Sequence, residues 1–241
     1  MKCFQTCLIF IIFISVLSLM CAGQPSKPNF VIIFLDDSGW ADFRPFDEPA
    51  YATPNVAQLA AEGCAFHNFY VPQAVCSASR AALMTGCYPG RTKVFGAHPP
   101  KAKGLDPKFA TLGEVLQKAG YKTAVFGKWH LGDQPETRPP ARGFDESCGL
   151  MYSNDMWEFH PENPEYWGQW PLWYWEHDSV AIERVTDKEQ AQLTTWYTEH
   201  AVDFINRHKN EQFFLYVPHS MPHVPLFVSD KFKDKSGAGL Y

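Results

Sequence analysis

Continuous apolar runs along the 241-residue chain alternate with segments in which apolar residues recur at helical spacing. Residues 28–35 and 213–217 are such runs, rich in β-branched and aromatic side chains, which is typical of strands buried on both faces of a parallel sheet. A further strand is predicted at residues 122–126. Helical spacing predicts helices at residues 53–63, 111–119 and 186–208. This alternation indicates an α/β fold, with a largely parallel or mixed sheet flanked by helices.

The apolar positions of two predicted helices indicate the faces that pack against the sheet. The first helix starts from Thr53 as N-cap, with Pro54 in its first turn, and Gly63 ends it. Its expected buried stripe is Val56, Leu59 and Ala60. The last helix is expected to bury Ala191, Thr195, Val202 and Ile205.

The N-terminus has the pattern of a secretory signal peptide. Lys2 precedes an uncharged apolar run over residues 8–20, and the small residues Ala22 and Gly23 follow. The run is shorter than the ~20 residues that span a membrane, so cleavage is expected and a stable membrane anchor is not. Residues 1–23 are therefore predicted to be removed, and residues 24–241 to form one domain or most of one. An extracellular, lysosomal or periplasmic location would each fit.

Composition limits the classes of partner. The formal net charge is -5, which gives no electrostatic footprint for nucleic acid. An anionic substrate would need a local cationic pocket instead. Of the seven cysteines, four lie beyond the predicted signal peptide, in a compartment that permits disulfides. They could form two disulfides, and Cys76 would then be structural.

Cys76 and Arg80 stand where an anion could bind. Cys76 precedes a compact apolar segment, Ala81 to Met84, that has the pattern of a helix start. Helix N-termini carry unpaired N–H groups and the positive end of the dipole, and Arg80 adds a permanent cation one turn later. The alternative is a buried cysteine before a helix whose arginine forms a surface salt bridge.

Asp36 and Asp37 end the first predicted strand, at the edge where α/β folds place their sites. Two adjacent carboxylates repel each other unless a cation neutralises them, and hard oxygen ligands suit Ca²⁺ or Mg²⁺. The alternative is a solvated Asp-Asp-Ser-Gly turn.

Basic and imidazole groups follow two other strands. Lys128 and His130 lie in a glycine-flanked turn after residues 122–126, where they could meet an oxyanion, although a loop lysine is often simply solvated. His219 and His223 both follow the strand at residues 213–217 and are competing candidates for a functional histidine, although His219 could simply hydrogen-bond nearby backbone.

Residues 157–175 contain five tryptophans and show neither helical nor strand periodicity, which predicts a long loop. Exposed indole faces could stack on sugars, or the tryptophans could pack against the domain.

Several of these stretches resemble signatures of the sulfatase family. Cys-Ser-Ala-Ser-Arg at residues 76–80 resembles Cys-x-Pro-Ser-Arg, with Ala78 in the place of proline. Residues 120–130 resemble Gly-Tyr-x-Thr…Gly-Lys-Trp-His, with Phe126 larger than the residue usual there. Residues 143–155 resemble Gly-Phe-Asp…Tyr-Ser-Asn-Asp, and His223 to Pro225 resembles a His-x-Pro run.

The resemblance implies an alkaline-phosphatase-like α/β domain that hydrolyses sulfate esters, either aryl sulfates or sulfated carbohydrates. It implies that a formylglycine-generating enzyme converts Cys76 to formylglycine, whose hydrated aldehyde is the nucleophile. It assigns calcium to Asp36, Asp37 and the modified Cys76. It assigns the remaining roles as follows: sulfate contacts to Arg80, Lys128 and Ser153, collapse of the covalent intermediate to His130, and proton donation to the leaving alcohol to His223.

The resemblance covers residues 29–241, and the family's further calcium and sulfate ligands lie beyond this stretch. The chain is therefore expected to be an N-terminal fragment of a catalytic domain, incomplete at its C-terminus. Two alternatives stay open: a phosphate or phosphonate ester hydrolase of the same superfamily, and an inactive secreted fragment that only binds sulfated glycans.

Overall fold

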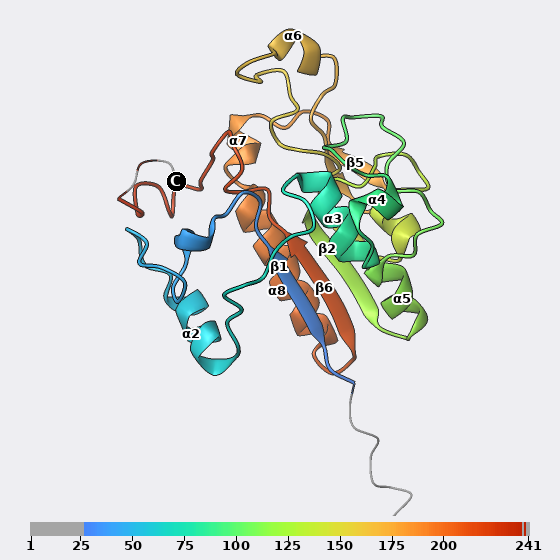
Figure 1. The fold of residues 1–241 in the computed structure, drawn as a ribbon. Coiled ribbons are helices and arrows are strands. Elements are labelled where there is room, and N and C mark those ends of the chain that lie inside the picture. Colours follow the sequence, from blue (N-terminus) through green and yellow to red (C-terminus); the bar gives the residue numbers. More distant parts are fainter. Residues whose placement is uncertain (1–26, 238, 240–241) are drawn as a thin grey trace, which may run out of the picture.

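A computed structural model describes residues 27–237 and 239 of the chain (Figure 1). The predicted signal peptide lies outside the described residues. Among those that are described, no helix combines the length and the apolar character needed to cross a membrane.

Six strands form one mixed sheet in the order β1-β6-β2-β3-β4-β5. The first three pairings, from β1 to β3, are parallel, and the last two are antiparallel. The expected α/β fold with a mixed sheet is therefore confirmed. The strands are β1 (Phe30–Phe34), β2 (Lys122–Lys128), β3 (Glu146–Leu150), β4 (Tyr174–Glu176), β5 (Ser179–Ile182) and β6 (Phe213–Pro218).

Helices cover both faces of the parallel part of the sheet. Figure 1 shows α8 on one face and α3, α4 and α5 on the other. The α-helices are α2 (Pro54–Glu62), α3 (Cys76–Thr85), α4 (Pro89–Thr92), α5 (Leu112–Lys118), α6 (Pro164–Trp167), α7 (Asp187–Gln190) and α8 (Leu193–His208). Two 3₁₀ turns complete the described elements, η1 (Trp40–Asp42) and η2 (Pro139–Arg142).

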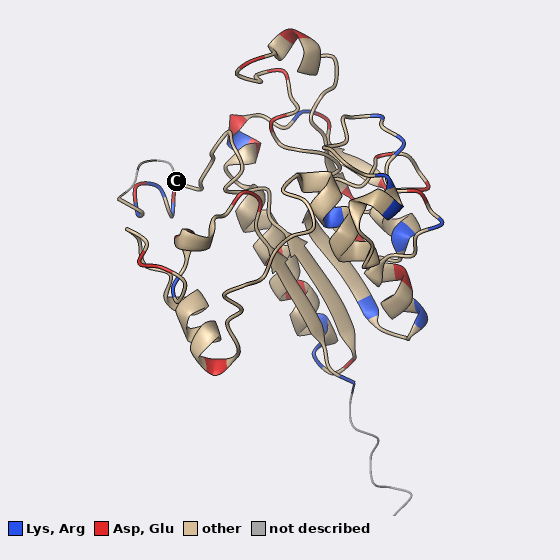
Figure 2. Ribbon diagram, in the orientation of Figure 1, with Lys and Arg blue, Asp and Glu red and all other residues tan. Residues whose placement is uncertain are grey.

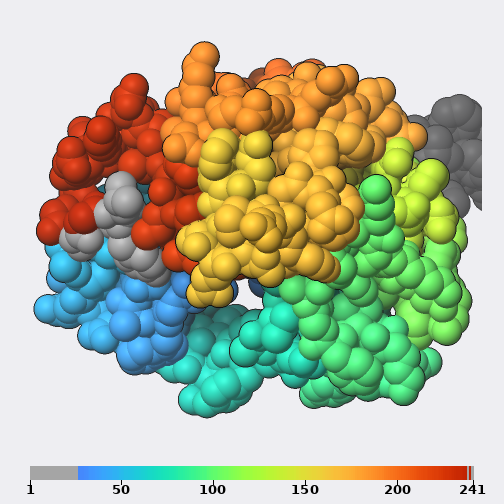
Figure 3. Space-filling model, turned by 90° about the horizontal axis from the view of Figure 1, so that it is seen from above, coloured from blue at the N-terminus to red at the C-terminus, as the bar shows by residue number. Residues whose placement is uncertain are grey.

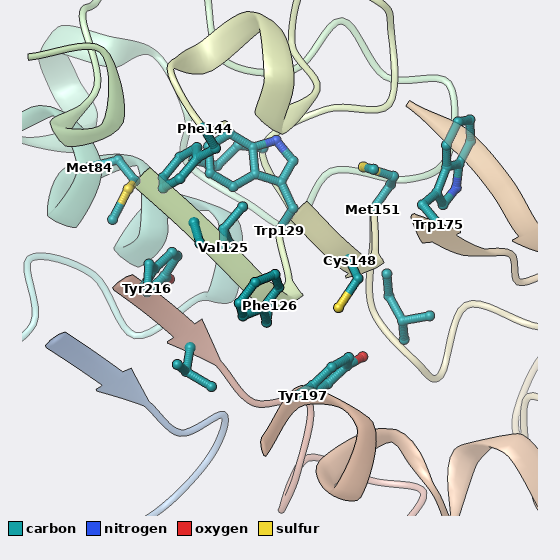
Figure 4. Packing of buried hydrophobic residues seen from close by; sticks show 14 of the residues in the cluster. Met84, Val125, Phe126, Trp129, Phe144, Cys148, Met151, Trp175, Tyr197 and Tyr216 are labelled. Atoms are coloured by element: carbon teal, nitrogen blue, oxygen red, sulfur yellow. The ribbon is translucent and has the colours of Figure 1, made fainter. Parts of the chain in front are cut away.

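The core lies around β2 and β6. β6 is buried along its whole length, as the sequence predicts, and β2 is buried from Thr123 onward. On the α8 side, Phe126 packs edge-on against Phe204 at a centroid distance of 6.1 Å. On the other side, Trp129 packs edge-on against Phe144 at 5.6 Å. Figure 4 shows these two layers of side chains with the strands between them.

Burial of β1 on both faces was a wrong expectation. β1 is the edge strand of the described sheet, hydrogen-bonded to β6 on one side, and Phe30, Val31 and Ile33 are 42%, 47% and 64% exposed. A continuous apolar run is typical of a buried strand, but the elements packed around the strand determine how much of it is covered. In this sheet the described residues cover β1 incompletely.

The expected helix faces were only partly correct, since Ile205 packs against the core but other members of the stripes do not. α2 lies away from the sheet, and Val56 and Leu59 are 37% and 68% exposed (Figure 1). The predicted helix at residues 186–208 divides into α7 and α8, and Val202 is exposed. The buried face of α8 is Leu193, Tyr197, Ala201 and Phe204. The apolar stripe predicted from the sequence left out the aromatic residues Tyr197 and Phe204, whose large rings are buried.

Candidate active site

The predicted site residues come from strand ends and from the start of α3, at the carboxyl edge of the parallel strands. Asp36 and Asp37 follow β1, Lys128 ends β2, Ser153 follows β3, and His223 follows β6. Since parallel strands point the same way, their carboxyl ends gather these side chains at one edge. Seen from above, Figure 3 shows a hollow at this end of the molecule, bordered by blue, green and yellow segments.

α3 begins at Cys76 itself, so the thiol occupies the first turn of the helix. Val75, the N-cap, has extended backbone angles and provides no side-chain cap. Ser77 in this turn accepts a hydrogen bond from the backbone N–H of His98 at 3.0 Å, which ties the loop at residues 95–100 to the helix start. Cys76 is partly exposed, whereas the next turn of α3, including Arg80, is buried.

Asp36 lies between two buried cations. Its Oδ1 is 3.0 Å from Nη2 of Arg80, and its Oδ2 pairs with Nζ of Lys128. The Arg80 and Lys128 side chains are fully buried, and the Asp36 side chain is 5% exposed. Burial alone would raise the pKa of Asp36, but the attraction of Arg80 and Lys128 outweighs it and lowers this pKa to about 2. Two cations and one carboxylate leave this cluster with one surplus positive charge.

Further hydrogen bonds fix the two cations. Nζ of Lys128 donates to Oγ of Ser153 at 2.8 Å. Nη1 of Arg80 donates to the carbonyl oxygen of Lys128 at 2.8 Å and to the hydroxyl of Tyr216 at 3.4 Å. Within the described part of the chain, neither Nε nor Nη2 of Arg80 has a partner that meets hydrogen-bond geometry, although Nη2 forms the ion pair with Asp36. The guanidinium therefore keeps buried donor capacity at Nε.

The thiol of Cys76 is not activated as a thiolate. Burial raises its pKa, and Asp36 raises it further, while Lys128 and Arg80 oppose the shift without cancelling it. An unmodified Cys76 therefore stays protonated near neutral pH, although it stands at a helix N-terminus. A nucleophile at this position requires chemistry that the cysteine side chain does not supply.

His130 is fully buried and uncharged. Its Nε2 is 2.9 Å from the carbonyl oxygen of His98, and its Nδ1 has no hydrogen-bond partner among the residues described. Burial, with the positive charges of Lys128 and Arg80, holds the pKa of His130 well below 6.5. Because a carbonyl oxygen only accepts, Nε2 carries the hydrogen and Nδ1 keeps a lone pair that could take a proton, although the neighbouring cations weaken the imidazole as a base.

The structure separates His219 from His223. Nε2 of His223 is 3.7 Å from Oδ2 of Asp37, and the side chain of Asp37 is 65% exposed, so this pair lies at the entrance of the site. His219 packs its ring against Tyr197 at 6.1 Å, and burial lowers its pKa to about 4. Of the two candidates, only His223 reaches the cluster of predicted residues.

The structure also bears on the metal ligands and the disulfides that the sequence suggested. Over residues 27–237 and 239, no three His, Cys, Asp or Glu side chains are grouped so that they could hold a metal ion. Asp36 and Asp37 offer adjacent carboxylates, and Asp37 is the one open to solvent. The four cysteines of this part of the chain, Cys64, Cys76, Cys87 and Cys148, are all free, so the alternative of two disulfides is wrong.

Sequence reasoning missed three residues that position the site. Ser77 and His98 connect the start of α3 to His130, and Tyr216 contacts Arg80 from the middle of β6. Ser77 lies within the signature at residues 76–80, next to Cys76, so its position could have indicated a role. The other two carry no signal, since His98 acts through its backbone and Tyr216 is one of several aromatic residues in a buried strand.

Comparisons with known proteins agree with this geometry. A family model described as Sulfatase matches residues 28–239. N-acetylgalactosamine-6-sulfatase of Mus musculus is 37% identical over an alignment 245 residues long, which covers 95% of this chain and 46% of that protein. Arylsulfatase A of Bos taurus is 35% identical over an alignment 235 residues long, which covers 90% of this chain and 45% of that protein. The chain thus spans about half the length of the curated relatives it matches.

Among solved structures, the PsFucS1 sulfatase from Pseudoalteromonas sp. superimposes with a TM-score of 0.77 at 27% identity. The match covers 92% of this chain and 49% of that one. Fold, motif order and family model therefore agree. The chain belongs to the sulfatase family.

Proposed function

We propose that this chain forms the N-terminal part of an enzyme that hydrolyses sulfate esters of carbohydrates. The observation that carries this proposal is the buried cluster of Arg80, Lys128 and Asp36, with its surplus positive charge, beside Cys76. Figure 2 shows how the basic residues (blue) and acidic residues (red) are distributed along the chain as a whole. Arg80 and Lys128 are dehydrated cations, and in a site of low dielectric they stabilise negative charge far better than in water. A sulfuryl group is a ligand of matching charge.

The described residues could both bind the sulfuryl group and transfer protons. Lys128 and Ser153 would hold one sulfuryl oxygen, and Arg80 would hold another through its buried donor. His223, at the entrance beside Asp37, is positioned to give a proton to the departing alcohol. His130, buried and neutral, is positioned to take a proton on the inner side.

The nucleophile and the metal are part of the proposal. Formylglycine in place of Cys76 would supply a hydroxyl nucleophile that the protonated thiol does not. Asp36 and Asp37 fit calcium as hard oxygen donors, and the ion would add positive charge near the sulfuryl group. They supply fewer than the 6–8 oxygens that Ca²⁺ takes, and both oxygens of Asp36 already pair with Arg80 and Lys128, so further oxygen ligands would have to complete the site.

We infer the substrate class from the names of the relatives reported above. A sulfated hexosamine, such as N-acetylgalactosamine 6-sulfate, is the proposed substrate class, and aryl sulfates are convenient probes of the same bond. The predicted signal peptide places maturation in the secretory pathway, with a formylglycine-generating enzyme as a transient partner. Delivery to a lysosome is part of the same proposal.

The decisive experiment is mass spectrometry of the proteolytic peptide that ends at Arg80, from chain secreted by cells that contain the modifying enzyme. Conversion replaces the sulfur of Cys76 by an aldehyde oxygen with loss of two hydrogens. Cys87 is the internal control and should keep its thiol. The converted chain should release sulfate from an aryl sulfate and leave a phosphate monoester intact.

An intact thiol at Cys76 together with no release of sulfate would overturn the proposal, and the interpretation as a glycan-binding fragment would replace it. Release of phosphate in preference to sulfate would instead assign the chain to the phosphate ester hydrolases of the superfamily.

A further inference from the structure

A second cavity lies beside the proposed active site, within the tryptophan-rich segment. Its volume is about 440 Å³, inside the ~300–1,000 Å³ that is usual for small-molecule sites. Three tryptophans, Trp170, Trp173 and Trp175, form much of its wall. Polar side chains complete the lining, among them Lys101, Asp133 and Arg138. Apolar walls with a few convergent polar groups are typical of ligand sites.

The indole rings are held in fixed orientations. Arg138 places its guanidinium 4.5 Å from the ring of Trp175, which is 6% exposed, and Trp173 packs against the same ring at 5.8 Å. Tyr166 packs edge-on against Trp170 at 5.3 Å. Trp173 nevertheless remains 36% exposed, so a large aromatic surface is supported from behind and open in front.

The polar side of the cavity is braced in the same way. Oδ2 of Asp133 accepts the backbone N–H of Lys101 at 2.7 Å, and Oδ1 accepts Nε2 of Gln134 at 2.7 Å. Arg138 donates from Nε to the carbonyl oxygen of Asp133 at 2.8 Å. The hydroxyl of Tyr152 donates to the carbonyl oxygen of Pro171 at 2.6 Å, which fixes the tryptophan-rich segment to the end of β3.

Three chain segments connect this cavity directly to the catalytic cluster. Lys101 lies three residues after His98, and Asp133 lies three residues after His130, so each is within about 11 Å along the backbone. Tyr152 is adjacent in sequence to Ser153, which accepts the hydrogen bond from Lys128. Part of the cavity wall therefore lies within about 11 Å along the backbone of His98 and His130, and next to Ser153 in sequence.

We propose that this cavity is a second saccharide subsite, which binds the sugar ring next to the sulfated residue of an oligosaccharide. The C–H face of a pyranose would stack on Trp173 and Trp170, and its polar substituents would meet Asp133, Lys101 and Arg138. Lys101 at the rim favours a neighbouring ring that carries a carboxylate or a second sulfate. The identity of the sulfated sugar rests on the proposed function. The subsite itself can be tested by binding as well as by turnover.

The test measures binding by intrinsic tryptophan fluorescence, using the full chain with Cys76→Ala to prevent turnover. The probes are N-acetylgalactosamine 6-sulfate alone and a trisaccharide that carries this residue at its non-reducing end. The parent chain should bind the trisaccharide at least about tenfold more tightly than the monosaccharide. Trp173→Ala should remove this difference, with monosaccharide affinity unchanged. Tyr88→Ala is the matched control, since Tyr88 is 72% exposed and does not line the cavity.

A second readout separates the subsite from the proposed function. In the chain that retains Cys76, Trp173→Ala should raise KM for the trisaccharide and leave turnover of a small aryl sulfate unchanged. Equal trisaccharide affinity in the parent and in Trp173→Ala would overturn the subsite, even if the aryl sulfate is hydrolysed. Loss of trisaccharide affinity in Trp173→Ala without turnover of any sulfate ester would support the subsite and overturn the proposed function.

Discussion

His219 and His223 follow the same strand, and the structure predicts that they affect different properties of the protein. His219 is partly exposed as a residue, but its Nδ1 is buried without a hydrogen-bond partner among the described residues, and its pKa is lowered from 6.5 to about 4. Because the unfolded chain binds this proton more tightly than the folded chain, stability is fully present above pH 6.5 and falls as the pH decreases toward 4. With these two pKa values, the loss is about 2 kcal/mol at pH 5 and ~3 kcal/mol below pH 4.

Urea unfolding at pH 7.5 and at pH 5.0, followed by circular dichroism, measures this loss. His219→Phe removes the titrating group and keeps a ring in the same place, so the difference in stability between the two pH values should shrink by about 2 kcal/mol. His219→Gln is the matched control that removes the titration but keeps a polar side chain, and it should reduce the difference equally. An undiminished difference in both variants would refute the assignment of His219 as a buried neutral histidine.

Two further predictions concern His223 and Asp36. His223→Ala should lower kcat for an aryl sulfate by ~10²–10⁴ through loss of proton transfer, whereas His219→Gln should retain turnover at pH 7.5. Comparable losses in both variants would contradict the separate roles of the two histidines. Asp36→Asn should lower the free energy of unfolding by ~3–5 kcal/mol in chelator, because Arg80 and Lys128 stay buried without their counter-charge. Asp37→Asn, at a side chain 65% exposed, is the control and should change it by less than ~0.5 kcal/mol.

The sequence predicts those parts of the fold that depend on local pattern. β6 is a continuous apolar run, and a strand covered on both faces needs such a run whatever its partners are. β2 has only the short apolar stretch at residues 124–126, between two lysines. The residues that follow them were predicted as site candidates because parallel strands end at one edge. Lys128 and His223 are placed near Asp36 and Asp37 by this rule.

What depends on long-range pairing is not visible in the sequence. The sequence of β3, Glu-Ser-Cys-Gly-Leu, shows no alternation of apolar and polar residues. Gly149 within it has φ 132°, and a Cβ at this position would lie 2.0 Å from the carbonyl oxygen of Gly127. This strand therefore exists because two glycine backbones can approach, and its own side chains do not indicate it. β4 lies in the tryptophan-rich segment for the same reason: pairing with β3 through Gly149 and Cys148 defines it.

The buried cluster could not be derived from sequence because each of its charges is ordinary when taken alone. A loop lysine and a helical arginine are usually solvated, and only the fold shows that both are fully buried around one carboxylate. Buried ion pairs often stabilise a protein less than apolar side chains of the same volume, since each charge loses its hydration. An excess of one cation makes this cluster less favourable still in the absence of a ligand. An anion that reaches Arg80 and Lys128 would meet donors already stripped of water, so the feature that lowers stability in the free chain is the one that favours a sulfuryl group.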